Sequence, residues 1–192
     1  PLGSAISGAC HTLVYQIVQR HKADVNIPCG KWGSPLHFAI VQRSDDEEAL
    51  IDLFLDNKAD VNAIGGVNST PLGAAVVAGE PGIVKTLLGK GADPNLVWER
   101  SGRSPLFLAC QTQDMDDINM LLEAGADVHL ATKRGSILQS AAIGYEDGCV
   151  EVIERILEAG AEVNAKTIGP YGTALHAATT KGNIAAVTCL LE

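Results

Sequence analysis

The sequence predicts an all-α solenoid, in which consecutive pairs of short helices stack on one another. A five-residue phrase returns at intervals of 36, 33, 34 and 35 residues. It occurs as KADVN ending at Asn26, KADVN at Asn62, GADPN at Asn95, GADVH at His129 and GAEVN at Asn164. A second phrase, which is typical of a helix start, returns at the same phase of each interval. Only 4% of the residues are aromatic although 46% are hydrophobic, which suits close packing of short helices. A period near 33 residues is typical of repeats that bury their apolar faces against their neighbours.

The five-residue phrase divides the chain into units. We interpret residues 5–192 as one repeat domain with four nearly whole units between two partial ones: 5–26, 27–62, 63–95, 96–129, 130–164 and 165–192. Residues 1–4, Pro-Leu-Gly-Ser, resemble the scar of a cleaved expression tag and are left out of the fold prediction. Because neither end shows the polar capping repeat that usually closes an array, we expect a fragment of a longer protein.

The first helix of each unit is predicted to begin at the second phrase. A Ser or Thr side chain can accept hydrogen bonds from the free N–H groups of the first turn, and proline fits the next position because it has no N–H to satisfy. The following leucine then points into the stack. The phrase occurs as Ser34-Pro35-Leu36-His37, Thr70-Pro71-Leu72-Gly73, Ser104-Pro105-Leu106-Phe107, Ser136-Ile137-Leu138-Gln139 and Thr173-Ala174-Leu175-His176.

The second helix of each unit is predicted to end just before the five-residue phrase, whose first residue then stands directly after the helix. Gly91, Gly125 and Gly160 follow apolar runs there, at the position where a left-handed backbone favours glycine. Lys22 and Lys58 stand at the same place in the first two exits. We therefore expect two lysines in the left-handed conformation, at a steric cost of roughly 1 kcal/mol each.

The two phrases resemble the TPLH and GADVN signatures of ankyrin repeats. The resemblance covers almost the whole chain, and it implies helix–loop–helix units with projecting β-turn fingers, a concave face built from the first helices, and a role in binding other proteins. The segments GKWGSPLHFAI and GPYGTALHAATTKGN are further similar to ankyrin arrays of fungal multidomain proteins, including the C-terminal sensor regions of NACHT-type receptors.

Residues that could support catalysis or metal binding do not converge in the sequence. His37 and His176 occupy the fourth place of the helix-start phrase, where the resemblance implies bonds to neighbouring backbone, and His129 replaces an asparagine at another backbone-bonding place. No HExxH, GxSxG or phosphate-binding glycine loop is present. The five cysteines have no CxxC spacing. We expect a non-enzyme without metal or cofactor, in a reducing intracellular and cytoplasmic setting.

The charge pattern separates two edges of the array. The net charge of −9 argues against broad nucleic-acid binding, and no apolar run reaches the roughly 20 residues that span a bilayer. The acids gather at the starts of the second helices, where the helix dipole favours them. The finger segments instead carry cations and aromatic rings, with Glu99 the main exception.

We predict that these finger residues contact a partner, since arginine and tryptophan are enriched at binding hot spots. Trp32 and Tyr171 each precede a glycine and a helix start, so bracing the turn explains them equally well, whereas Trp98 has no such counterpart. In the first helices, Phe38 and Leu108 either belong to the core or form the floor of a groove. The complete set of candidates is Lys31, Trp32, Phe38, Trp98, Arg100, Arg103, Leu108, Lys133, Arg134, Tyr145, Lys166 and Tyr171.

Together these features predict a monomeric module that binds a protein or peptide with an acidic and partly apolar segment, and neither nucleic acid nor membrane. Two alternatives stay open. The array could be a structural spacer or self-association domain. It could also regulate, or recruit substrate to, an enzyme whose catalytic part lies outside this sequence.

Overall fold

The computed structural model describes residues 11–28, 33–42, 47–66, 70–144, 146–167 and 169–192. Apart from one short hairpin, the regular elements of the described chain are helices joined by turns, as the repeat pattern predicts. It forms two compact units that divide between Asp93 and Pro94. Each unit is described by itself below.

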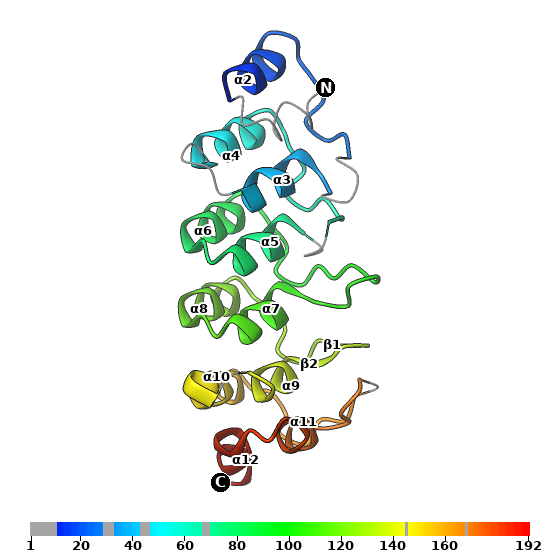
Figure 1. The fold of residues 1–192 in the computed structure, drawn as a ribbon, viewed down its shortest axis with the longest axis vertical. Helices are drawn as coiled ribbons and strands as arrows, with labels where there is room; N and C mark the ends of the chain where they lie inside the picture. Colours follow the sequence, from blue (N-terminus) through cyan, green and yellow to red (C-terminus); the bar gives the residue numbers. More distant parts are fainter. Residues whose placement is uncertain (1–10, 29–32, 43–46, 67–69, 145, 168) are drawn as a thin grey trace. The chain divides into compact units, whose positions relative to one another are not determined.

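Within its described residues, the first unit contains two helix pairs and one further helix. These are α2 (His11–Gln19), α3 (Pro35–Gln42), α4 (Glu47–Asp56), α5 (Pro71–Ala78) and α6 (Pro81–Gly89). Helix α3 packs against α4, its partner in the same repeat, and against α5, the first helix of the next repeat. The second helices α4 and α6 lie on one side of α3 and α5 (Figure 1). The fully buried side chains include Leu36, Ile40, Phe54, Leu72 and Leu87.

The second unit repeats this arrangement. Its elements are α7 (Pro105–Thr112), α8 (Met115–Glu123), β1 (Ala131–Thr132), β2 (Gly135–Ser136), α9 (Ile137–Ala142), α10 (Glu146–Glu158), α11 (Ala174–Lys181) and α12 (Ile184–Leu191). The first helices α7, α9 and α11 pack against one another in sequence, and α10 packs against α12. Their shared core includes Leu106, Ile118, Leu121, Ile137, Ile153 and Ile156.

The predicted caps are confirmed at the starts of the first helices. The hydroxyl of Ser104 accepts a hydrogen bond from the Phe107 amide at 3.1 Å. The hydroxyls of Thr70, Ser136 and Thr173 make the equivalent bond with the third residue of α5, α9 and α11. Imidazole Nδ1 of His37 lies 3.0 Å from the Ser34 hydroxyl and accepts from the Ser34 amide, so this histidine has the structural role that the sequence predicts.

The left-handed exits are confirmed as well. The φ angle is +90° at Gly91, +88° at Gly125 and +99° at Gly160. Lys22 and Lys58 have φ angles of +47° and +65°. The repeat register therefore overrides the steric preference of the two lysines, because the following phrase requires that backbone direction.

Asparagine side chains link the exits of consecutive repeats. Nδ2 of Asn62 donates to the Gly91 carbonyl at 3.1 Å, and its Oδ1 accepts from the Asp93 amide at 2.8 Å. One side chain therefore satisfies a donor and an acceptor of the next repeat. The same pair of bonds joins Asn26 to Lys58 (3.0 Å) and Asp60 (2.7 Å), and Asn95 to Gly125 (2.9 Å) and Asp127 (2.7 Å).

This ladder stops at His129, which corrects the expectation that its side chain bonds to backbone. Within the described ranges, the imidazole of His129 makes no hydrogen bond to the carbonyl of Gly160 or the amide of Glu162. The reason is geometric. An amide presents its donor and acceptor side by side, whereas the two imidazole nitrogens point in diverging directions.

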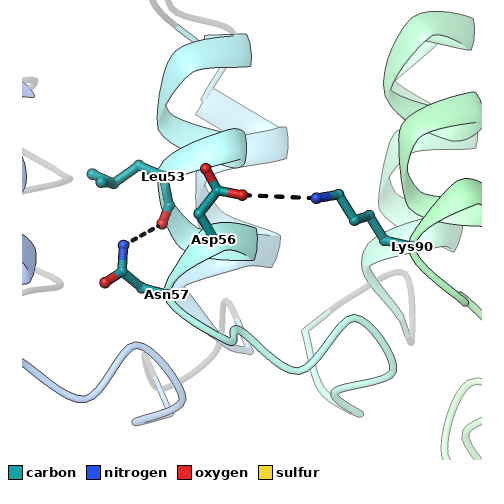
Figure 2. Close-up of polar contacts among 4 residues, drawn as sticks. All are labelled: Leu53, Asp56, Asn57 and Lys90. Carbon is teal, nitrogen blue, oxygen red and sulfur yellow. Dashed lines mark hydrogen bonds and ion pairs between the residues drawn. The ribbon is translucent and has the colours of Figure 1, made fainter.

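The C-terminal ends of α4 and α6 meet at the surface of the first unit. Nζ of Lys90 lies 3.7 Å from the Asp56 carboxylate, and both side chains are at least half exposed. Beside them, Nδ2 of Asn57 donates to the Leu53 carbonyl at 2.8 Å (Figure 2). An exposed ion pair of this kind contributes about 0–1 kcal/mol, so the repeats are held together mainly by the buried core.

Candidate protein-interaction surface

The candidate residues from the sequence fall into three groups. Lys31, Trp32 and Tyr145 lie outside the described residues. Phe38 and Leu108 lie in first helices. The remaining candidates lie in fingers of the second unit: Trp98, Arg100, Arg103, Lys133, Arg134, Lys166 and Tyr171.

The finger at residues 96–103 is a tight turn that presents Trp98 and Arg100. The amides of Ser101 and Gly102 both donate to the Trp98 carbonyl, at 3.0 and 2.9 Å. The Arg100 guanidinium carbon lies 5.8 Å from the centroid of the Trp98 ring. A cation over an aromatic face at this distance is stabilised by about 0.5–1 kcal/mol at an exposed site. The turn therefore offers a cation and an aromatic ring as one group.

Arg103, in the same finger, is less exposed than Arg100. Its side chain is half-buried, and its Nε has no hydrogen-bond partner in the part of the chain that the structure describes. A buried donor without a partner is costly. Arg103 is thus held partly within the turn, whereas Arg100 is exposed.

The next finger is an antiparallel hairpin whose two-residue turn is Lys133-Arg134. Both side chains are exposed. The hairpin pairs Ala131 with Ser136 and Thr132 with Gly135. It also bonds to the preceding finger, because the Thr132 hydroxyl donates to the Gly102 carbonyl at 2.6 Å.

A third finger, residues 165–172, packs against the hairpin. The Thr167 amide donates to the Gly172 carbonyl at 2.9 Å, which closes the finger. A Cβ on Gly169 would lie 2.7 Å from the Cα of Gly135, so the two fingers approach at glycine. Lys166 is exposed and Tyr171 is half-buried. The fold therefore gathers the finger candidates of this unit on three adjoining fingers.

Phe38 and Leu108 belong to the core, which corrects the prediction that they contact a partner. Phe38 is 4% exposed and Leu108 is 2% exposed. Each stands four residues after a helix cap, at a position that turns its side chain between neighbouring helices. The sequence left core and groove floor equally open because both environments favour an apolar residue.

The exposed apolar residues of the first unit were missed by the sequence reasoning. Val41 on α3 and Val77 on α5 are both exposed, and each stands seven residues after its cap. Because α3 packs against α5 in the same register, the two valines lie at equivalent places on neighbouring helices. Ile64, in the finger of the same unit, is also exposed. The signal was available in the repeat alignment, where this place is occupied by Gln111, Ile143 and Thr180 in the other repeats and is therefore not restricted to apolar residues.

Groups that could hold a metal or form a nucleophile are not assembled in the described residues. No set of three His, Cys, Asp or Glu side chains there could hold a metal ion. The thiol of Cys110 is fully buried, and burial raises its pKa well above the ordinary value. None of the described helices is both long and apolar enough to cross a membrane.

Comparison with known proteins agrees with this geometry. Family models described as "Ankyrin repeats (3 copies)" match residues 2–98 and 49–132, and one described as "Ankyrin repeats (many copies)" matches residues 138–191. The crystal structure of the human ASB11 ankyrin repeat domain superposes with a TM-score of 0.76 at 24% sequence identity, covering 100% of this chain and 82% of that one. The chain belongs to the ankyrin repeat family.

Two relatives show how the chain compares with longer proteins. The mouse B-cell lymphoma 3 protein homolog is 27% identical over 161 residues, which are 82% of this chain and 36% of that protein. Human NF-kappa-B inhibitor alpha is 33% identical over 142 residues, which are 68% of this chain and 43% of that protein. The chain thus spans less than half of either relative.

Ankyrin arrays present extended surfaces that bind other proteins, and their fold is typically non-catalytic. The chain is accordingly a protein–protein interaction module of the ankyrin repeat class.

Proposed function

We propose that the fingers of the second unit bind an acidic segment of a partner protein. The observation that carries the proposal is a local reversal of charge. Segments 96–103 and 131–136 contain four cationic side chains and one acidic one, although the chain as a whole has a net charge of −9. Such a patch attracts acidic partners and repels basic ones, which increases both the association rate and the specificity.

The first unit, taken by itself, has a separate candidate contact for an apolar segment of a partner. Val41, Val77 and Ile64 expose aliphatic side chains that a partner could cover. On the third finger, further candidates for partner contact are Lys166 and Tyr171. The sequence alone supports three more candidates, which are Lys31, Trp32 and Tyr145.

We infer further that the module binds protein without catalysis, as a monomer in a reducing intracellular and cytoplasmic setting. The relative named NF-kappa-B inhibitor alpha is by its name an inhibitor of another protein, and protein binding is the property that we transfer from it. The buried thiol of Cys110, which forms no disulfide, agrees with a reducing compartment. The negative net charge argues against nucleic acid as the ligand.

The test is affinity capture with this chain, followed by titration of the captured protein. Trp98→Ala, and the double reversal Arg100→Glu with Arg103→Glu, should each weaken binding by about 1–3 kcal/mol if they lie at the hot spot. The double reversal should also slow association more at low salt than at high salt.

A matched control reverses two exposed cations outside the fingers, Arg20→Glu with Lys85→Glu. It changes the net charge by the same amount and should leave affinity nearly unchanged. Equal loss in the finger and control variants, with circular dichroism intact, would remove the fingers from the binding site.

A second candidate function, self-association, is favoured by one observation. Ile184 and Leu191 of α12 are 74% and 68% exposed, so this helix presents two large aliphatic side chains that a second copy of the chain could cover. Sedimentation equilibrium distinguishes the two functions. A dimer that Ile184→Glu dissociates would support the spacer role, and a monomer at all concentrations would support the binding module.

A further inference from the structure

The Trp98–Gly102 turn is held partly by the finger that follows it. Its own bonds use the carbonyl of Trp98, which accepts from the amides of Ser101 and Gly102. The last two carbonyls of the turn, those of Ser101 and Gly102, accept hydrogen bonds from the hairpin. Nε of Arg134 donates to the Ser101 carbonyl at 3.1 Å, and the Thr132 hydroxyl donates to the Gly102 carbonyl at 2.6 Å.

The aliphatic stems of the hairpin tip cover the same turn. A Cβ on Gly102 would lie 3.0 Å from Cγ of Lys133 and 3.3 Å from Cγ of Arg134. Gly102 has a φ angle of +62°, so a side chain there would be strained as well as crowded. The Arg134 amide also donates to the Thr132 hydroxyl at 3.1 Å, which ties the two contacting residues together. Contacts from residues 132–134 therefore restrain the turn on several sides.

We propose that Arg134 is a positioning residue of the interaction surface, which holds the Trp98–Gly102 turn so that Trp98 and Arg100 reach the partner in one preformed arrangement. The role of the turn in partner binding rests on the proposed function, whereas the restraint of the turn by Arg134 does not. The bond to Ser101 directs Arg134 toward the neighbouring finger, so its main effect on binding is indirect. A preformed turn reduces the conformational entropy that binding would otherwise cost.

The test compares Arg134→Gln with Arg134→Met. In glutamine, Nε2 is separated from the backbone by the same number of bonds as Nε of arginine, so the variant retains a donor but loses the charge. Methionine has a similar stem and no donor. The readout is amide hydrogen exchange at Ser101 and Gly102, measured by NMR on the protein without any partner. Loss of a hydrogen bond of about 1 kcal/mol should accelerate opening about fivefold.

We expect Arg134→Met to accelerate exchange at Ser101 and Gly102, while Arg134→Gln stays near the wild-type rates. The amide of Phe107, which the Ser104 cap protects in the adjoining helix, serves as the internal reference and should not change. Lys166→Met is the matched control, since it removes an exposed cation from the third finger.

Three results would overturn the proposal. Unchanged rates in Arg134→Met would mean that the turn holds itself. Equal acceleration in the Gln and Met variants would assign the effect to charge. Acceleration at Phe107 as well would indicate general destabilisation. Because no partner is present, each of these results is independent of whether the fingers bind an acidic segment.

Discussion

Helices α6 and α8 are the second helices of consecutive repeats, and they differ at one buried position. Ile83 in α6 and Asp117 in α8 each stand twelve residues before the end of their five-residue phrase. Ile83 is 5% exposed and Asp117 is 0% exposed. The equivalent residues in α4 and α10 are Leu50 and Val152, both buried. A carboxylic acid thus occupies a place that the neighbouring repeats fill with aliphatic side chains.

Asp117 lies in the first turn of α8, where the helix dipole favours a negative charge, but its carboxyl group has little else to compensate one. Neither carboxyl oxygen has a hydrogen-bond partner among the residues that the structure describes. Helix α7, which packs against α8, contains no acidic or basic side chain. Burial, together with the negative charges of Asp114 and Asp116, raises the pKa of Asp117 to about 7. The comparison teaches that the repeat accommodates an acid in its core by favouring its neutral form.

The repeat that contains α8 departs from its neighbours in two other places. Gln113 has a φ angle of +59° between the two helices, where glycine stands at Gly79 and Gly182. His129 lacks the ladder bonds that Asn95 makes. Like the burial of Asp117, each of these two differences is locally unfavourable for repeat 96–129.

The largest expected effect comes from making α8 like α6. Asp117→Ile should stabilise the protein at pH 7 by about 2–4 kcal/mol, because it replaces an unpaired buried acid with the residue of the neighbouring repeat. Urea midpoints measure the change. The reciprocal variant Ile83→Asp should destabilise by a similar amount. A neutral or destabilising Asp117→Ile would mean that the site does not behave as apolar core.

The second prediction concerns pH and isolates the same group. The unfolded carboxyl has the ordinary pKa of 3.8, and the folded one has a pKa of about 7. The folded state therefore binds more protons between these values, so the contribution of Asp117 is most favourable below pH 4 and is lost as the pH rises to 7. The slope should not exceed about 1.4 kcal/mol per pH unit.

The measurement is the difference in unfolding free energy between wild type and Asp117→Asn from pH 4 to pH 8. Titrating groups that do not interact with Asp117 cancel in that difference, whereas Asp114 and Asp116 contribute to it through their interaction with Asp117. A difference that does not vary with pH would show that Asp117 is ionised at its ordinary pKa in the folded protein.

The smallest expected effect concerns the hydrogen bonds that Asn95 makes to the next repeat and His129 does not. His129→Asn should add the two ladder bonds, to the Gly160 carbonyl and the Glu162 amide, and stabilise the protein by about 1 kcal/mol. Asn95→His should cost a similar amount, because it removes the two bonds to Gly125 and Asp127. The thermal midpoints of both variants test this. If His129→Asn does not raise the thermal midpoint, the backbone geometry at this exit, and not the histidine side chain, prevents the two hydrogen bonds.

Much of the fold was predictable from local rules applied to the sequence. Caps such as Ser104 and exits such as Gly125 recur at a constant phase, and each is explained by the chemistry of a helix end. The same phase predicted the left-handed Lys58, whose φ angle is +65°. The positions of the fingers followed from the segments between these signals.

The finer character of the candidate surface was not predictable in this way. The sequence around Phe38 and Leu108 does not show whether these side chains face the core or a surface groove, because both environments favour an apolar residue. Asp117 was interpreted as an acid placed by the helix dipole, as its neighbour Asp116 is. The side chain of Arg134 reaches a carbonyl 33 residues earlier in the chain.

By itself, the sequence determined the repeat class, the phase of its helices and the basic, aromatic character of its fingers, because these depend on residues close together in the chain. Tertiary structure alone decided which of those residues are available to a partner. Burial of Asp117 and Leu108 and the bond from Arg134 to Ser101 arise where residues distant in sequence pack together. Such contacts depend on the geometry of stacked repeats, which no single repeat contains.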